Sequence, residues 1–122
     1  MSNNQANKVA PYSSIVGSII ANARRNKGLG QAEISSQLNI SQATWSRIER
    51  GTTSVNVSQL SSIAELLHVA PHEILSKADD MASELKSRGI NITHYPEKNN
   101  EAMVILGATA LIGLAALLFG GE

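Results

Sequence analysis

The stretch between Gly30 and Gly51 constrains the fold of this chain most, because it encodes two short helices with a tight break between them. The first helix is expected over about residues 31–38, from apolar side chains at helical spacing. Asn39-Ile40-Ser41 interrupts that spacing, and Ser41 is suited to cap a second helix that runs to about Arg50. Gly51 then ends the second helix. The sequence therefore predicts a helix pair joined by a tight turn, with small polar residues opening the second helix.

Helical patterns continue on both sides of this pair. Before it, apolar residues recur at three- and four-residue steps from Tyr12 onward, with Ser13 or Ser14 as a possible cap. After it, Asn56 is placed to cap a fourth helix, and Pro71 stands at a first helical position that opens a fifth. We therefore expect an all-α domain of five helices over residues 12–88.

The segments that flank this domain are polar. Residues 1–11 lack apolar periodicity and are interpreted as a disordered arm, with no secretory signal. Residues 89–101 are interpreted as a linker, in which residues 90–95 alternate weakly enough to be either a short strand or extended chain. The chain has no cysteine, which excludes disulfides and thiolate metal sites and fits the cytoplasm. No metal and no cofactor are expected, because Pro71 separates the two nearest histidines, His68 and His72.

Charge is distributed unevenly along a chain whose formal net charge is zero. Residues 1–56 hold six basic and two acidic residues, a net charge of +4, whereas residues 57–122 hold four basic and eight acidic residues, a net charge of −4. A basic half beside a helix pair indicates an anionic partner.

The second helix of the pair carries two different faces. Trp45 and Ile48, three residues apart, are expected in the core. The other face presents short donors and acceptors, which a helix needs when its first turns meet base edges in DNA. Two short helices arranged in this way form the layout of a helix-turn-helix. The residues that offer the exposed face are Ser41, Gln42, Ala43, Thr44, Ser46 and Arg47.

The region from about Val16 to Leu75 resembles the lambda-repressor-like family of DNA-binding domains, often called the Xre or Cro type. Gly17, Ile20 and Arg24 are similar to residues of the family's first helix, and Gln31 to the glutamine that opens its second. Ser46-Arg47-Ile48-Glu49-Arg50-Gly51 resembles the signature that closes its recognition helix. The resemblance implies a five-helix DNA-binding domain that binds as a dimer to half-sites about one DNA turn apart.

The resemblance also implies roles for individual residues. Gln42 is implied as the leading base reader, since a glutamine can bond to adenine through two hydrogen bonds. Gln31 would contact the DNA backbone and buttress Gln42, and Arg24 would pair with Glu49. Ala43 or Thr44 would meet a thymine methyl group, and Arg47 a guanine or a phosphate. Backbone contacts after the recognition helix are implied for Arg50, Thr52 and Thr53.

The last segment, residues 102–121, contains twenty residues without a charge. As one helix it would extend about 30 Å, the thickness of the hydrocarbon core of a bilayer. We interpret it as a single apolar helix that anchors the protein to the cytoplasmic face of the inner membrane. The alternative is an oligomerisation helix, because small residues at four-residue spacing permit close helix contact in either setting.

The function predicted from the sequence is a transcriptional regulator, a repressor that binds double-stranded DNA as a homodimer or higher homo-oligomer. A second hypothesis is a membrane-anchored adaptor that uses the same motif to dock a cytoskeletal or other protein. A third is the antitoxin of a toxin–antitoxin pair. An enzyme is not expected, because the sequence presents neither a nucleophile–base pair nor paired carboxylates.

Overall fold

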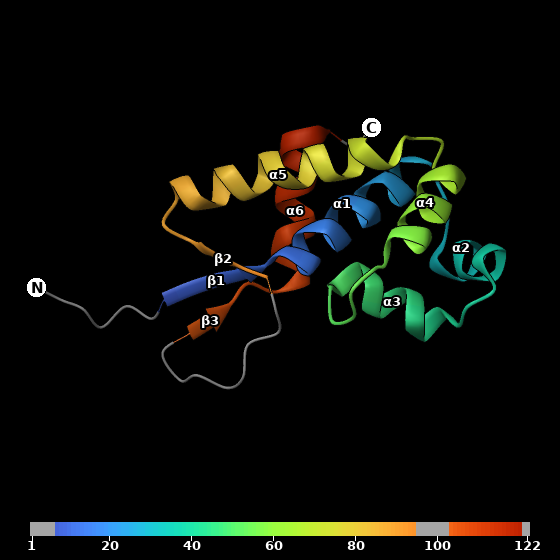
Figure 1. The fold of residues 1–122 in the computed structure, drawn as a ribbon, viewed down its shortest axis with the longest axis horizontal. Coiled ribbons are helices and arrows are strands. Elements are labelled where there is room, and N and C mark those ends of the chain that lie inside the picture. Colours follow the sequence, from blue (N-terminus) through green and yellow to red (C-terminus); the bar gives the residue numbers. More distant parts are fainter. Residues whose placement is uncertain (1–6, 95–102, 121–122) are drawn as a thin grey trace, which may run out of the picture.

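The computed structural model describes residues 7–94 and 103–120, which form six helices and three short strands (Figure 1). In chain order these are β1 (Asn7–Pro11), α1 (Tyr12–Asn26), α2 (Gln31–Leu38), α3 (Gln42–Arg50), α4 (Val57–Leu66), α5 (Pro71–Ser87), β2 (Asn91–Thr93), β3 (Met103–Ile105) and α6 (Ala108–Phe119).

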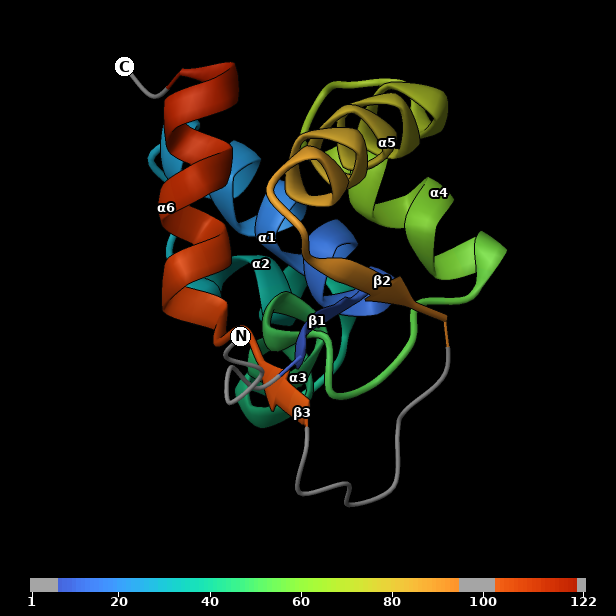
Figure 2. The ribbon, with the colours of Figure 1, turned by 90° about the vertical axis from the view of Figure 1, so that its left-hand side faces the viewer.

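Helix α1 is the centre of the fold. Its residues from Ser14 to Asn22 are all buried, because α3, α5 and α6 pack around it on different sides. Figures 1 and 2 show α1 enclosed in this way, with α6 standing against it at the side away from α4. A helix covered on all sides needs apolar or self-satisfied side chains around its whole circumference. Ile15, Ile20 and Ser18 meet that requirement, and the Ser18 hydroxyl donates to the Ile15 carbonyl at 2.7 Å.

The ends of the predicted helices agree closely with the structure. Ser41 caps α3 by accepting the Thr44 N–H at 3.0 Å. Asn56 caps α4 in a reciprocal capping box with Gln59, with N···O distances of 2.7 and 3.0 Å. Pro71 opens α5 as its first residue. These residues explain why the starts of α3, α4 and α5 could be located from the sequence alone.

Two glycines allow α1 and α3 to approach each other closely. A Cβ at Gly17 would come within 2.8 Å of the Glu49 carbonyl carbon and closer still to the carbonyl oxygens of Ile48 and Glu49. Gly51 has a φ of +76° and lies against the backbone of Ser14, so it needs both the left-handed conformation and the absence of a side chain. The backbones of α1 and α3 are therefore in direct contact.

A three-stranded parallel sheet lies at the start of α1, with β1 between β2 and β3. The all-α prediction and the disordered arm are therefore wrong for residues 7–11. Within the predicted linker, β2 forms the short strand that is one of the two alternatives for residues 90–95; residues 1–6 and 95–101 lie outside the described residues. Val9 and Ala10 are buried in this sheet. Strands of three to five residues are too short to show a reliable alternation, and β1 pairs only with segments more than 80 residues away in the chain.

The C-terminal segment differs most from its prediction. A single helix over residues 102–121 is wrong, because β3 and α6 occupy that segment with extended Gly107 between them, and residues 102 and 121 lie outside the described residues. Helix α6 has 12 residues, and none of the helices in residues 7–94 and 103–120 combines the length and the hydropathy that a membrane span needs. The single long helix that the membrane-anchor prediction requires is therefore not formed by residues 103–120.

Helix α6 instead buries one apolar face within its own chain, whereas Leu117 on its outer face is 83% exposed. Leu111 and Ala115 are buried in the common core, and the Lys77 ammonium of α5 lies 5.6 Å from the centre of the Phe119 ring. At the end of α6, the Asn22 and Asn26 amides of α1 donate to the Gly120 carbonyl at 3.2 and 3.3 Å. The chain thus supplies partners for the inner face of α6, and α1 and α5 are those partners.

Candidate nucleic-acid interface

Helix α3 separates its side chains into a buried and an exposed face. Trp45, Ile48 and Glu49 are buried against the rest of the domain. The side chains of Gln42, Ala43 and Arg47 are exposed on the opposite face, and those of Thr44 and Ser46 are half-buried beside them. The exposed face has no acidic residue, so nothing on it repels the phosphates of a DNA duplex.

Glu49 fixes the orientation of α3 by accepting hydrogen bonds from side chains of α1, α2 and α3 itself. The Arg24 guanidinium of α1 bonds to both carboxylate oxygens, with Nη2 3.1 Å from Oε1 and Nε against Oε2. The Trp45 indole donates to Oε2 at 2.7 Å, and the Gln31 amide of α2 donates to Oε1 at 2.8 Å. Glu49 and Arg24 are 3% and 7% exposed, so this is a buried ion pair with a full set of donors. The pair implied by the resemblance is confirmed.

The first turn of α3 is ordered by its cap. The Ser41 hydroxyl accepts the Thr44 N–H and also donates to Thr44 Oγ1 at 2.9 Å. Both side chains are therefore held in place at the helix end that would enter a groove. Gln42 and Ala43, next to this cap, project outward.

The last turn of α3 is held by the first turn of α1. The Ser13 hydroxyl donates to the Gly51 carbonyl at 2.9 Å, and the Ser14 hydroxyl donates to the Arg50 carbonyl at 3.1 Å. The sequence predicts Ser13 or Ser14 as the cap of α1, but neither serine caps this helix. Pro11 precedes α1 and provides no side-chain cap. Sequence reasoning missed this role because it depends on the close approach of α1 and α3 at Gly17 and Gly51.

The residues after α3 lie at the same exposed edge. Arg50 and Thr52 are exposed, and Thr53 is half-buried. The Arg50 Nε donates to the Ser46 carbonyl at 3.3 Å, and the Thr52 hydroxyl donates to the Arg47 carbonyl at 3.4 Å. These predicted backbone-contact residues are therefore adjacent to the exposed face of α3.

Gln31 is placed differently from its implied role. Its amide donates to Glu49, and no hydrogen bond to Gln42 is found among the described residues. The reason is physical: a buried carboxylate is a stronger acceptor than a neutral amide. Gln31 remains half-buried at the start of α2, next to the exposed Gly30.

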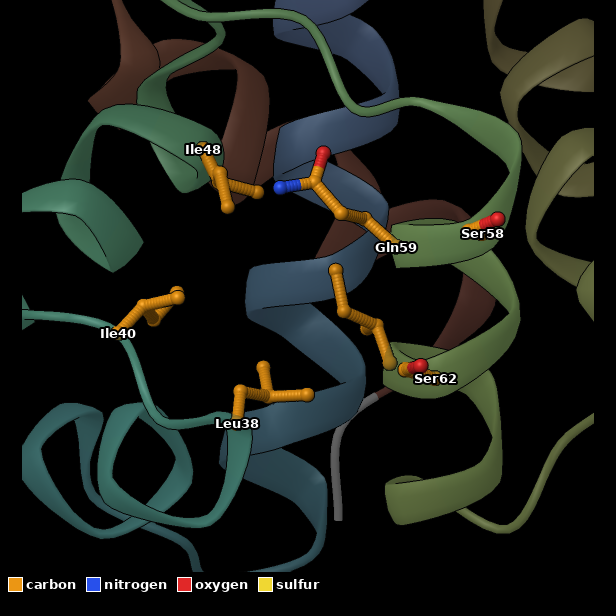
Figure 3. Close-up of a pocket in the computed structure, with 7 residues that line it drawn as sticks. Leu38, Ile40, Ile48, Ser58, Gln59 and Ser62 are labelled. Carbon is orange, nitrogen blue, oxygen red and sulfur yellow. The ribbon is translucent and has the colours of Figure 1, made fainter.

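A small slot of about 170 Å³ opens between α3, the turn before it and α4. Figure 3 shows Leu38, Ile40 and Ile48 around this slot, with the Gln59 side chain of α4 reaching toward Ile48. The slot lies behind α3, on the buried Ile48 side rather than on the face that carries Gln42. It is therefore separate from the candidate interface.

Other charged and metal-binding groups add little to the site. Arg25 and Lys27 are exposed at the end of α1, whereas the charge of Arg24 is matched by Glu49. His68 follows α4 and His72 lies in the first turn of α5. In residues 7–94 and 103–120, no group of three or more histidines and carboxylates is arranged to hold a metal ion.

Comparison with known proteins agrees with this geometry. The family model described as a helix-turn-helix domain matches residues 16–75. The chain is 36% identical over 66 residues to the uncharacterized HTH-type transcriptional regulator y4dJ of Sinorhizobium fredii, an alignment that covers 54% of this chain and 86% of y4dJ. The crystal structure of the clp gene regulator ClgR from Corynebacterium glutamicum superposes with a TM-score of 0.61 and 21% identity, over 63% of this chain and 82% of ClgR.

Proposed function

Because the chain belongs to the helix-turn-helix family of DNA-binding regulators, we propose that it is a sequence-specific transcriptional repressor that reads DNA with α3. The observation that carries this proposal is the division of α3 into a locked face and an exposed face. Base reading requires side chains placed to within a fraction of an ångström on a rigid element. The hydrogen bonds to Glu49 and the serine contacts of α1 supply that rigidity.

Gln42 is the proposed base reader. It is the first residue of α3, exposed, and next to a cap that fixes the backbone around it. An amide at this position can donate to adenine N7 and accept from the adenine N6 amino group in the major groove. Ala43 and Thr44 supply methyl groups that suit thymine, and Arg47, one turn later, suits a guanine or a phosphate.

The backbone contacts are proposed for the residues around the two ends of the motif. Arg50 and Thr52 follow α3, where contacts to phosphates would set register without reading sequence. Ser41, Ser46, Thr53 and Gln31 complete the proposed surface. Ser46, Thr53 and Gln31 are half-buried, and exposed Ser41 is already hydrogen-bonded to Thr44. We therefore assign these residues positioning roles beside the phosphates.

We further propose that the protein binds DNA as a homodimer. One motif covers only a half-site, and two recognition helices about 34 Å apart are needed to read both halves of a two-fold symmetric operator. The test is the mass of the free and the DNA-bound protein by light scattering, together with selected binding sites. Selected sites without two-fold symmetry would rule out this mode.

The experiment that tests base reading is selection of binding sites from a random DNA pool by the wild-type chain and by Gln42→Ala. We expect the variant to lose about 1–3 kcal/mol of discrimination at one base pair of each half-site, with unchanged thermal stability. Gln37→Ala, an exposed glutamine of α2, is the matched control and should leave the selected sequence unchanged. An identical selected sequence for Gln42→Ala would remove Gln42 from the interface.

The membrane-anchored adaptor is not carried forward, since it requires the spanning helix over residues 102–121 that β3 and α6 replace. An antitoxin would use the same DNA-reading surface, and no observation in the described residues favours it over an ordinary repressor.

A further inference from the structure

A groove lies where the C-terminal segment meets the end of the recognition helix. One wall is formed by Arg50, Gly51 and Thr52 after α3, and the other by Ile105 and Leu106 at the end of β3. The groove has a volume of about 420 Å³, within the range of small-molecule sites, which is about 300–1,000 Å³. Its second wall lies outside residues 16–75, the part that matches the helix-turn-helix family. The groove is therefore a feature that the C-terminal segment adds to the motif.

The three side-chain hydroxyls of the groove already have partners. The Ser13 and Ser14 hydroxyls donate to the Gly51 and Arg50 carbonyls, and the Thr52 hydroxyl donates to the Arg47 carbonyl. Their protons are therefore not available to a ligand. Among the described residues that line the groove, Arg50 alone carries a charge.

The Arg50 side chain is the group with donors to spare. Its Nε bonds to the Ser46 carbonyl at 3.3 Å, and this is its one hydrogen bond within the described residues. The other donors of a guanidinium suit a carboxylate through two parallel bonds. Beside it, Ile105 is 56% exposed and Leu106 is half-buried, so the opposite wall offers apolar surface to a ligand.

We propose that this groove binds a free amphiphilic carboxylate of medium chain length, with its head on Arg50 and its apolar body against Ile105 and Leu106. The cationic rim selects the charge of the head, and the apolar wall distinguishes this ligand from a bare inorganic anion. Occupation of Arg50 removes one of the proposed DNA-backbone contacts. The ligand and DNA therefore weaken each other's binding by the same factor, which makes the groove a regulatory site. This last step rests on the proposed function, whereas the binding step does not.

The test uses the full chain without DNA and titrates decanoate below its micelle concentration, followed by backbone amide chemical shifts. We expect shifts at Arg50–Thr52 and at Ile105–Leu106, and binding about tenfold weaker for decanol, which lacks the charged head. Arg50→Gln and Ile105→Ser should each weaken decanoate binding by a similar factor. Arg25→Gln, an exposed arginine at the far end of α1, is the matched control and should bind decanoate like the wild type.

Three results would overturn the proposal: no decanoate binding, shifts located elsewhere, or equal affinity for decanoate and decanol. Binding only to vesicles of phosphatidylglycerol, with no binding of free decanoate, would also overturn it. A second titration in the presence of a selected DNA site tests the regulatory step. If decanoate binds in the groove and DNA affinity does not change, the site stands and Arg50 is not a DNA contact.

Discussion

The helix-turn-helix motif and the C-terminal segment are attached to the same helix, α1, by different physical means. Helix α3 is joined to α1 by directional hydrogen bonds, through buried Glu49 and Arg24 and through two serine hydroxyls, in addition to the apolar packing of Trp45 and Ile48. Helix α6 is joined to α1 mainly by apolar packing around Leu111 and Ala115, with two amide bonds at its last carbonyl. Hydrogen bonds are directional and specify an orientation, whereas the free energy of apolar contact is non-directional and depends mainly on the apolar area buried. The proposed recognition helix is therefore oriented by more directional contacts than α6 is.

The largest predicted effect concerns Glu49. Replacing it by Ala leaves the Arg24 guanidinium buried without its partner and removes acceptors from Trp45 and Gln31. We expect a loss of about 3–5 kcal/mol in the free energy of unfolding, measured by chemical denaturation with Trp45, the chain's one tryptophan, as the fluorescent probe. Glu65→Ala, an exposed carboxylate of α4, should change stability by less than about 0.5 kcal/mol. Equal effects of the two substitutions would contradict the role of the buried network.

The next effect tests the attachment of α6. Leu111→Ala removes a side chain that is 1% exposed in the common core, and we expect a loss of about 2–4 kcal/mol. Leu117→Ala, on the outer face of the same helix with 83% exposure, should cost less than about 0.5 kcal/mol. Thermal unfolding of both variants separates them. If Leu111→Ala were as stable as the wild type, α6 would not pack on the domain, and the comparison between the two regions would fail.

The same comparison explains which elements the sequence could predict. Helices α3, α4 and α5 carry local markers at their ends, such as Ser41, Gly51, Asn56 and Pro71, so their limits follow from neighbouring residues. The Arg24–Glu49 pair followed from the resemblance. No local sequence pattern predicts that Gln31 and Trp45 also donate hydrogen bonds to Glu49, because these bonds depend on how α1, α2 and α3 pack together.

The C-terminal segment shows what composition alone cannot determine. Twenty uncharged residues have the same composition whether they cross a membrane or cover a core. The decisive facts are non-local: β3 pairs with β1, and α1 leaves one side open for α6. Gly107, in extended conformation, stands at the break between β3 and α6, whereas Gly113 of the same run lies inside α6. A glycine inside an apolar run is also common in membrane helices, so it did not decide the matter.

Two glycines inside helices sharpen the contrast further. Gly17→Ala in α1 forces a Cβ against the backbone of α3, and we expect it to destabilise the protein by about 1–3 kcal/mol. Gly113→Ala in α6 meets no atom within 4 Å, and we expect it to stabilise the protein by about 0.5–1 kcal/mol, as Ala is the better helix former. Both follow from thermal melts. Opposite signs for the same substitution would show that α3 requires a close approach and α6 does not.

The smallest predicted effect lies where the sheet and α1 meet. The Tyr12 hydroxyl at the start of α1 donates to Asp79 of α5 at 2.6 Å. Burial, together with this bond and the nearby negative charge, raises the pKa of Tyr12 to about 12. Because the unfolded chain releases this proton near pH 10, the stabilisation is complete below that pH and decreases as the pH rises from about 10 to about 12.

Tyr12→Phe should therefore lose less than about 1 kcal/mol at neutral pH, since the bond is partly exposed to solvent. The difference in stability between wild type and Tyr12→Phe should shrink between about pH 10 and 12, and Asp79→Asn should reduce the same pH dependence. Asp80→Asn, the exposed neighbour, should leave it unchanged. A difference that stays constant up to pH 12 would show that Tyr12 is not held by Asp79, and that α5 meets α1 through apolar packing alone, as α6 largely does.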